Sequence, residues 1–152
     1  MTRHALPLIA AGLLAACAST PRTPAPVDVA ALEREVAAAE TAFAKTMADR
    51  DLAAFASHIA EDAIFSPGPN TLRGKAAIVA AWSKYYEGDA PFSWKPETVV
   101  VRAGGTLAQT KGPVFDPAGT PIAEFRSTWR LEADGRWRVV FDDGTCLCRR
   151  PE

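Results

Sequence analysis

The sequence has little of what metal-binding, nucleic-acid-binding and membrane-spanning proteins require. Three cysteines and two histidines occur in 152 residues, and they form no set with metal-ligand spacing. With 17 basic and 18 acidic residues, the formal net charge of -1 leaves no surplus of positive charge for nucleic acid. The apolar run over residues 5–16 is too short to cross a bilayer as a helix. We therefore expect no metal, no cofactor and no nucleic-acid partner.

The rest of the composition is typical of one globular domain. Hydrophobic residues make up 48% of the chain and charged residues 23%, and an aromatic content of 9% is too high for a disordered protein. We find no internal repeat. A chain of this length buries roughly two-thirds of its unfolded surface, which suffices for a single core.

The first 16 residues have the layout of an export signal. Arg3 and His4 precede the apolar run of small and aliphatic residues over 5–16. The run ends in LAAC (residues 14–17), which resembles the lipobox of bacterial lipoproteins, where cleavage precedes the cysteine and its thiol is lipidated. The resemblance implies a mature chain that begins at Cys17 and has 152 − 16 = 136 residues.

A tether follows the lipobox. Residues 17–27 contain the lipidated cysteine and a segment rich in proline and small polar residues, which near polyproline II would extend roughly 30 Å. Lipid on Cys17 would hold the protein at a membrane. Because Ala18 stands where an inner-membrane retention signal has aspartate, the resemblance implies the periplasmic face of the outer membrane. We assign residues 28–148 to one domain and 149–152 to a tail.

Helix patterns dominate the first half of this domain. After a cap at Asp28, apolar residues three or four apart predict a long amphipathic helix through Val29, Leu32, Val36, Ala39, Phe43 and Met47. A second, short helix follows a cap at Asp51, and a third covers residues 75–86. Between these two helices, residues 63–65 read as a short strand that ends at a loop with two prolines.

The second half changes to strand periodicity. Turn sequences separate four strand-like segments, residues 94–102, 106–115, 120–132 and 136–148. Helices followed by an antiparallel meander predict an α+β fold.

The last hairpin allows a register to be predicted. A three-residue loop over 133–135 keeps the apolar residues on one face, whereas a two-residue turn would pair them with charged residues across the strands. The predicted pairs are Leu131 with Trp137, Trp129 with Val139, Ser127 with Phe141, Phe125 with Asp143, Arg126 with Asp142 and Arg130 with Arg138. The predicted inner face is Phe125, Trp129, Leu131, Trp137, Val139 and Phe141. Asp143 is thereby placed on the inner face beside Phe125 and Ser127.

Three stretches resemble SnoaL-like and ketosteroid-isomerase-like members of the nuclear transport factor 2-like superfamily. They are AEDAIF (residues 60–65), LRGKAAI (72–78) and WRLEADGRWRVV (129–140), in the order and spacing of that superfamily. The resemblance covers nearly all of residues 28–144. It implies a cystatin-like cone of three helices on a curved antiparallel sheet, an apolar cavity between them, and a homodimer.

The resemblance does not extend to the catalytic residues of the isomerases. Ketosteroid isomerases use a tyrosine, a general-base aspartate and a late-strand aspartate where this chain has Phe43, Pro67 and Ser127. Phenylalanine donates no hydrogen bond and proline accepts no proton. Asp143 is the remaining candidate acid or base, because a carboxyl group in an apolar cavity has a raised pKa. The alternative is a carboxylate at the open end of the strand that is solvated or hydrogen-bonded to the backbone.

Other candidate residues point to binding or structure. An apolar ligand site would be lined by Phe65, Trp82, Tyr86, Trp94, Phe125, Ser127 and Trp129, although a filled core needs similar residues. Asp62 stands where a strand begins after a helix, which suits a structural role, and His58 has no partner residue for catalysis or metal binding in the sequence. Cys146 and Cys148 suggest a disulfide first, free thiols second and a metal third.

Together these patterns predict a lipid-anchored envelope protein whose domain binds a small apolar ligand or serves as an assembly module. Two alternatives remain open. One is a SnoaL-like enzyme of isomerase, cyclase or dehydratase type that uses Asp143 as acid or base, and the other is a purely structural dimerisation domain.

Replacing the lipobox cysteine tests the anchor directly. In cells fed a labelled fatty acid, we expect the wild-type chain to carry the label and Cys17→Ser to carry none, since serine offers no thiol for lipidation. Gel fluorography of the immunoprecipitated protein measures this. Label that persists on the serine variant would contradict the predicted anchor.

Overall fold

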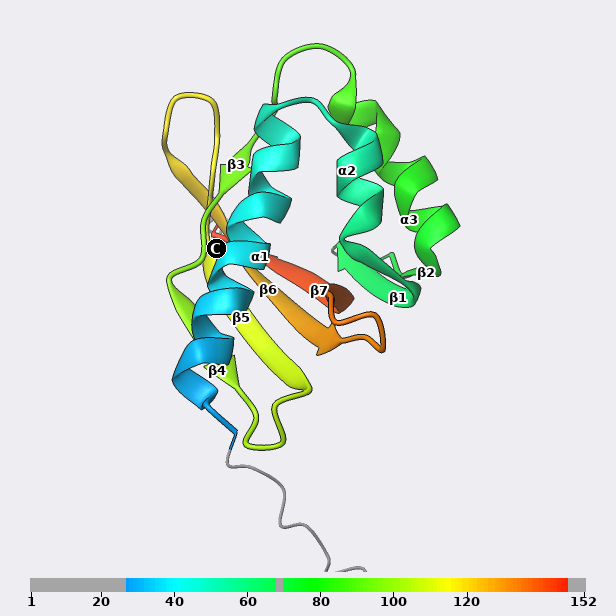
Figure 1. Ribbon diagram of the computed structural model, residues 1–152. Helices are drawn as coiled ribbons and strands as arrows, with labels where there is room; N and C mark the ends of the chain where they lie inside the picture. The colour runs from blue at the N-terminus through cyan, green and yellow to red at the C-terminus, as the bar shows by residue number, and fades with distance from the viewer. Residues whose placement is uncertain (1–26, 68–69, 148–152) are drawn as a thin grey trace, which may run out of the picture.

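The computed structural model describes residues 27–67 and 70–147, in which three helices cover one face of a curved, mainly antiparallel sheet (Figure 1). The predicted α+β cone is confirmed. The helices are α1 (Val29–Ala48), α2 (Leu52–Ser57), α3 (Lys75–Trp82) and the 3-10 helix η1 (Ser83–Tyr86). The strands are β1 (Ile59–Pro67), β2 (Leu72–Arg73), β3 (Ser93–Trp94), β4 (Thr98–Val101), β5 (Leu107–Phe115), β6 (Pro121–Leu131) and β7 (Trp137–Cys146).

The export signal, Cys17, most of the tether, Cys148 and the tail lie outside these described residues. Within the described part of the chain, no helix combines the length and the apolar character needed to cross a membrane.

Both predicted helix caps are confirmed. Asp28 accepts the Ala31 N–H at 2.9 Å and Asp51 accepts the Ala54 N–H at 2.8 Å, so each carboxylate satisfies an N–H group that its helix leaves unpaired. The predicted stripe of α1 faces the sheet, and Val36 and Met47 are fully buried. The third helix is shorter than predicted, because its last turn tightens into η1.

The sheet contains one pairing that no local pattern indicates. Its strand order is β2-β1-β7-β6-β5-β3, with β4 also paired to β5. Strand β1 runs parallel to β7 although nearly the whole domain separates them in sequence, and all other pairs are antiparallel. The short β2 was not predicted.

The predicted strand over residues 94–102 is two strands. Strands β3 and β4 both pair with β5, and the chain between them passes close to Gly112. A Cβ atom at Gly112 would lie 2.1 Å from the main-chain oxygen of Lys95. Only glycine leaves space for the main chain to pass this close to β5. The predicted strand is interrupted here, between β3 and β4.

The predicted hairpin register is right near the turn and wrong beyond it. Leu131 pairs with Trp137 and Trp129 with Val139, as predicted. A β-bulge then shifts β7 by one residue, since Thr128 pairs with Phe141. The pairs beyond the bulge are Ser127 with Asp142, Arg126 with Asp143 and Phe125 with Gly144. An extra residue reverses which face each later side chain occupies.

Because of the bulge, two of the predicted side-chain placements are wrong. Phe141, predicted on the inner face, keeps 40% of its surface exposed. Asp142, predicted outside and opposite Arg126, instead pairs with the buried Ser127 on the inner face.

Charges on the outer face neutralise one another. The predicted pairing of Arg130 with Arg138 is confirmed. Arg130 donates to both oxygens of Asp62, at 2.7 and 3.0 Å, and to Glu132, while Arg138 donates to Asp134 at 2.7 Å. The acidic partners offset the repulsion between the two arginines.

A side chain at residue 112 tests the close approach of the chain between β3 and β4 to β5. We expect Gly112→Ala to lower the free energy of unfolding by about 1–3 kcal/mol, because the new methyl group meets backbone rather than a flexible side chain. Gly104→Ala is the matched control, since its Cβ would meet nothing within 4 Å. Urea unfolding followed by tryptophan fluorescence measures both, and equal midpoints would contradict this account.

Candidate functional site

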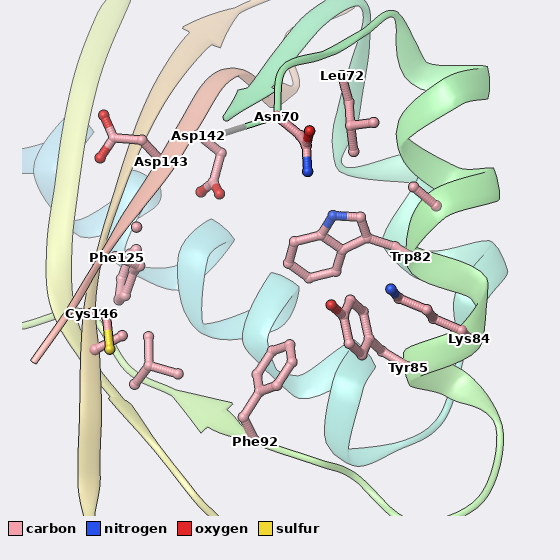
Figure 2. A pocket seen from close by; sticks show the side chains of 14 residues that line it. Asn70, Leu72, Trp82, Lys84, Tyr85, Phe92, Phe125, Asp142, Asp143 and Cys146 are labelled. Atoms are coloured by element: carbon pink, nitrogen blue, oxygen red, sulfur yellow. The ribbon is translucent and has the colours of Figure 1, made fainter. Parts of the chain in front are cut away.

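A cavity of about 540 Å³ lies between the inner face of the sheet and the helical segment α3–η1 (Figure 2). Its volume is within the range of small-molecule sites in proteins. It is lined by Asn70, Leu72, Ala81, Trp82, Lys84, Tyr85, Phe92, Val114, Ala123, Phe125, Asp142, Asp143, Gly144 and Cys146. One wall is therefore aromatic and the opposite wall carries carboxyl groups.

Three rings form the aromatic wall. Trp82 contacts Tyr85 at 5.7 Å and Phe92 at 6.1 Å between ring centroids, and Tyr85 contacts Phe92 at 5.5 Å, all edge to face. Behind them, the buried ring of Phe55 stacks on Trp82 at 5.0 Å. Each ring of the wall therefore packs against at least two others, in the edge-to-face or stacked geometry that aromatic pairs prefer.

Asp142 is the main polar group on the opposite wall. Its Oδ2 accepts a 2.7 Å hydrogen bond from Ser127 Oγ, and Figure 2 shows its carboxyl group directed toward the rings. Burial is the main cause that raises the pKa of Asp142 to about 8; the charges of Glu40 and Asp143 add to the rise, and the Ser127 hydrogen bond limits it. The carboxyl group is thus mostly protonated at neutral pH.

A second buried carboxyl group, Glu40 of α1, lies behind this wall. It is completely buried and accepts hydrogen bonds from Trp94 Nε1 at 2.8 Å, Thr110 Oγ1 at 2.6 Å and Trp129 Nε1 at 2.9 Å. Burial raises the pKa of Glu40, and these donors, together with Ser127, counteract that effect. The Ser127 side chain is therefore close to both carboxyl groups.

The family now follows from sequence and fold together. A family model of the SnoaL-like domain matches residues 40–140. The chain belongs to the SnoaL-like domain family. No curated protein matches its sequence.

Solved structures share the fold of this SnoaL-like domain. A nuclear transport factor 2-like protein of unknown function from Pseudomonas putida has a TM-score of 0.64 at 19% identity, over 76% of this chain and 87% of that one. A cystatin-like fold protein from Burkholderia xenovorans has a TM-score of 0.63 at 18% identity, over 79% of this chain and 95% of that one. A ketosteroid isomerase-like protein from Erwinia carotovora atroseptica has a TM-score of 0.63 at 16% identity, over 77% of this chain and 97% of that one.

The structure distributes the seven predicted ligand-binding residues over three places. Trp82 and Phe125 line the cavity. Phe65, Ser127 and Trp129 are fully buried in the core of the SnoaL-like domain.

The other two of the seven take part in hydrogen bonds behind the cavity. Trp94 donates to Glu40, and Tyr86 shares a 3.0 Å hydrogen bond with the Thr46 hydroxyl group. Tyr85 and Phe92 take their place in the lining. Since Tyr85 and Tyr86 are adjacent on η1, helical spacing alone does not decide which one faces the cavity.

Asp143, the predicted acid or base, lies beside the residue that geometry favours. It borders the cavity, but its carboxyl group is directed away from the rings in Figure 2, and it pairs with Arg126 across the strands. The bulge in β7 explains the one-residue difference from Asp142.

Glu40 had a signal in the sequence that the prediction did not use. It lies four residues after Val36 and three before Phe43, within the apolar stripe of α1. A glutamate in such a stripe must be hydrogen-bonded, because burying an unpaired carboxylate is very unfavourable.

The remaining candidates have structural surroundings. His58 lies against the rings of Phe43 and Trp129, at 5.6 and 6.4 Å, and burial lowers its pKa. Hydrogen bonds from Arg130 hold the pKa of Asp62 below its usual value. Cys146 is disulfide-bonded, but Cys148 lies outside the described residues, so their pairing stays a prediction.

The raised pKa of Asp142 predicts a dependence of stability on pH. Its carboxyl group has a pKa of about 8 in the folded domain and near 3.8 in an unfolded chain, so the folded state binds the proton more tightly. Its contribution to the free energy of unfolding is therefore complete below about pH 4 and is lost as pH rises toward 8, by at most about 1.4 kcal/mol per pH unit.

We expect Asp142→Asn to reduce this slope, because the amide does not titrate. Urea unfolding at intervals from pH 4 to 9 measures it. Asp143→Asn is the control: it removes the smallest of the contributions to the raised pKa of Asp142 and leaves the bond from Ser127 to Asp142 intact, so most of the slope should remain. A slope that is unchanged in Asp142→Asn would contradict the assignment.

Proposed function

We propose that this SnoaL-like domain binds a small, mainly apolar molecule in the cavity. The observation that carries the proposal is the cavity itself, in which Trp82, Tyr85 and Phe92 face the Asp142 carboxyl group (Figure 2). Apolar walls with a few polar groups are typical of sites that orient a small ligand.

Unpartnered polar groups in the cavity support binding over a filled core. Among the described residues, Trp82 Nε1 and the Tyr85 hydroxyl group have no hydrogen-bond partner. By contrast, the N–H groups of Trp94 and Trp129, which pack in the interior, both donate to Glu40. The first pair is therefore available to a ligand and the second is not.

A second candidate function is acid–base catalysis by Asp142. A pKa of about 8 suits proton transfer near neutral pH, and the carboxyl group borders the cavity. The likeness to a ketosteroid isomerase-like protein supports the fold but not that reaction, since Phe43 and Pro67 replace the residues it needs. In this proposal Asp142 takes the role first considered for Asp143.

We also propose that the domain works at the outer membrane, on the periplasmic side, held by lipid on Cys17. The lipobox-like LAAC sequence and the proline-rich tether support this location. An assembly role as a homodimer remains the alternative use of the outer sheet face, where Phe141 is exposed.

Filling the cavity tests the proposed binding. The neutral apolar dye N-phenyl-1-naphthylamine should bind the full chain, with a rise in fluorescence. We expect Ala123→Phe to weaken dye binding by tenfold or more, roughly 1.4 kcal/mol, because Ala123 lines the cavity and a phenyl ring would occupy its volume.

Ile122→Phe is the matched control, since Ile122 is the adjacent residue on β6 and is exposed. It should leave the dye affinity unchanged, and circular dichroism confirms that both variants fold. No dye binding by the wild type, or equal binding by both variants, would overturn the proposal.

A further inference from the structure

We propose that the cavity selects a small apolar molecule that carries a carboxylate group, and that the ammonium group of Lys84 binds this carboxylate. This rests on the proposed binding function and specifies its ligand class. Lys84 belongs to η1 and lines the cavity together with Trp82 and Tyr85. In Figure 2 its side chain extends from η1 toward these two rings.

Lys84 differs from the other four lysines of the chain in its charge partners. Each of those four forms an ion pair with a carboxylate, namely Lys45 with Asp49, Lys75 with Glu61, Lys95 with Glu97 and Lys111 with Glu124. Within residues 27–67 and 70–147, Lys84 forms no ion pair. Its ammonium group lies instead over the Tyr85 ring, 4.9 Å from the centroid. The lysine that lines the cavity is therefore the one whose charge a ligand could neutralise.

The acidic groups near the cavity do not balance this positive charge. Asp142 faces the rings, but burial raises its pKa to about 8, so it carries little negative charge at neutral pH. Asp143 is directed away from the rings in Figure 2 and has Arg126 as its partner across the strands. The two acidic residues that follow η1, Glu87 and Asp89, are exposed and take part in none of the ion pairs of the described residues. Near η1 the cavity thus favours an anion over a cation.

A carboxylate also offsets the cost of placing a ligand beside Lys84. A ligand that fills the cavity displaces water next to the ammonium group, and a cation that loses water without gaining a negative partner is destabilised. A carboxylate replaces that water with a charge-assisted hydrogen bond.

The aromatic wall supplies further donors for the same kind of ligand. The Tyr85 hydroxyl group and the Trp82 indole N–H have no hydrogen-bond partner among the described residues, and the indole can only donate. Both belong to the α3–η1 wall, as Lys84 does. The acid group of the ligand therefore lies at this wall, and its apolar body faces Val114 and Phe125 of the sheet.

Three matched probes test the ligand class on the full chain at pH 7. 2-Naphthylacetate carries a carboxylate, 2-naphthylacetamide is its neutral counterpart, and 2-(2-naphthyl)ethylammonium carries a positive charge. Displacement of N-phenyl-1-naphthylamine gives the affinity of each. We expect the carboxylate to bind about fivefold more tightly than the amide, the upper end of what an exposed ion pair contributes, and the ammonium probe to bind least.

The salt dependence of this preference is a second measurement on the unaltered chain. The advantage of the carboxylate over the amide should shrink as sodium chloride rises from about 20 mM to about 500 mM, because salt screens the attraction between exposed charges. A preference that salt does not change would overturn the assignment to Lys84.

Each other outcome has a definite meaning. Equal binding of the three probes, or tightest binding of the ammonium probe, overturns this inference and leaves the proposed function standing, because a small molecule still occupies the cavity. The same conclusion holds if the dye binds and no probe displaces it. If the dye itself does not bind, the proposed function fails and this inference fails with it.

Lys84→Met tests whether one side chain causes the preference. Methionine keeps a long, unbranched side chain without the charge, so the ratio of the carboxylate and amide affinities should fall to about one. Lys84→Arg keeps the charge and should retain the preference. Lys45→Met is the matched control, since it removes the same charge from an exposed lysine that does not line the cavity, and it should keep the wild-type ratio.

A wild-type ratio in a folded Lys84→Met would overturn the role of Lys84. Circular dichroism shows whether each variant folds. If Lys84→Met does not fold, the order of the three probes and its salt dependence on the wild-type chain still decide the ligand class.

Discussion

The buried carboxylate of Glu40 is the interaction around which this domain is organised. It joins α1 to Trp94 of β3, Thr110 of β5 and Trp129 of β6, which lie 54, 70 and 89 residues after it in the sequence. A buried carboxylate is tolerated only with its hydrogen bonds complete. These hydrogen bonds, together with the buried Val36 and Phe43, fix how α1 lies on the sheet.

The bulge in β7 brings a second carboxyl group to the same place. Without the extra residue, Asp143 would take the inner position, as strict alternation requires. With it, Asp142 reaches the buried Ser127 hydroxyl group. Bulges often redirect a side chain next to a functional site, and here the redirected group is the one in the cavity. Because the charge of Glu40 contributes to the raised pKa of Asp142, α1 and β7 are electrostatically linked.

The aromatic wall is held in place from behind. Arg50, at a φ of 60°, donates through its guanidinium group to the main-chain oxygens of Met47 and Tyr85, which ties η1 to the end of α1. The Thr46–Tyr86 hydrogen bond joins the same two elements. The rings of Trp82 and Tyr85 are thus fixed relative to the carboxyl wall, so a ligand would meet a site whose shape is formed in advance.

Local patterns in the sequence determined the helices, both aspartate caps, the hairpin loop and the family resemblance, because each depends on residues close together in the chain. They also named Trp82 and Phe125 of the cavity lining. Only the tertiary structure decided the parallel pairing of β1 with β7, the bulge that exchanges Asp142 for Asp143, and the choice of Tyr85 over Tyr86. It also decided the role of Glu40, since a helical stripe shows that a residue is buried but not which donors from distant strands will meet it. Those contacts depend on how separate elements pack, and periodicity along one element carries no information about that packing.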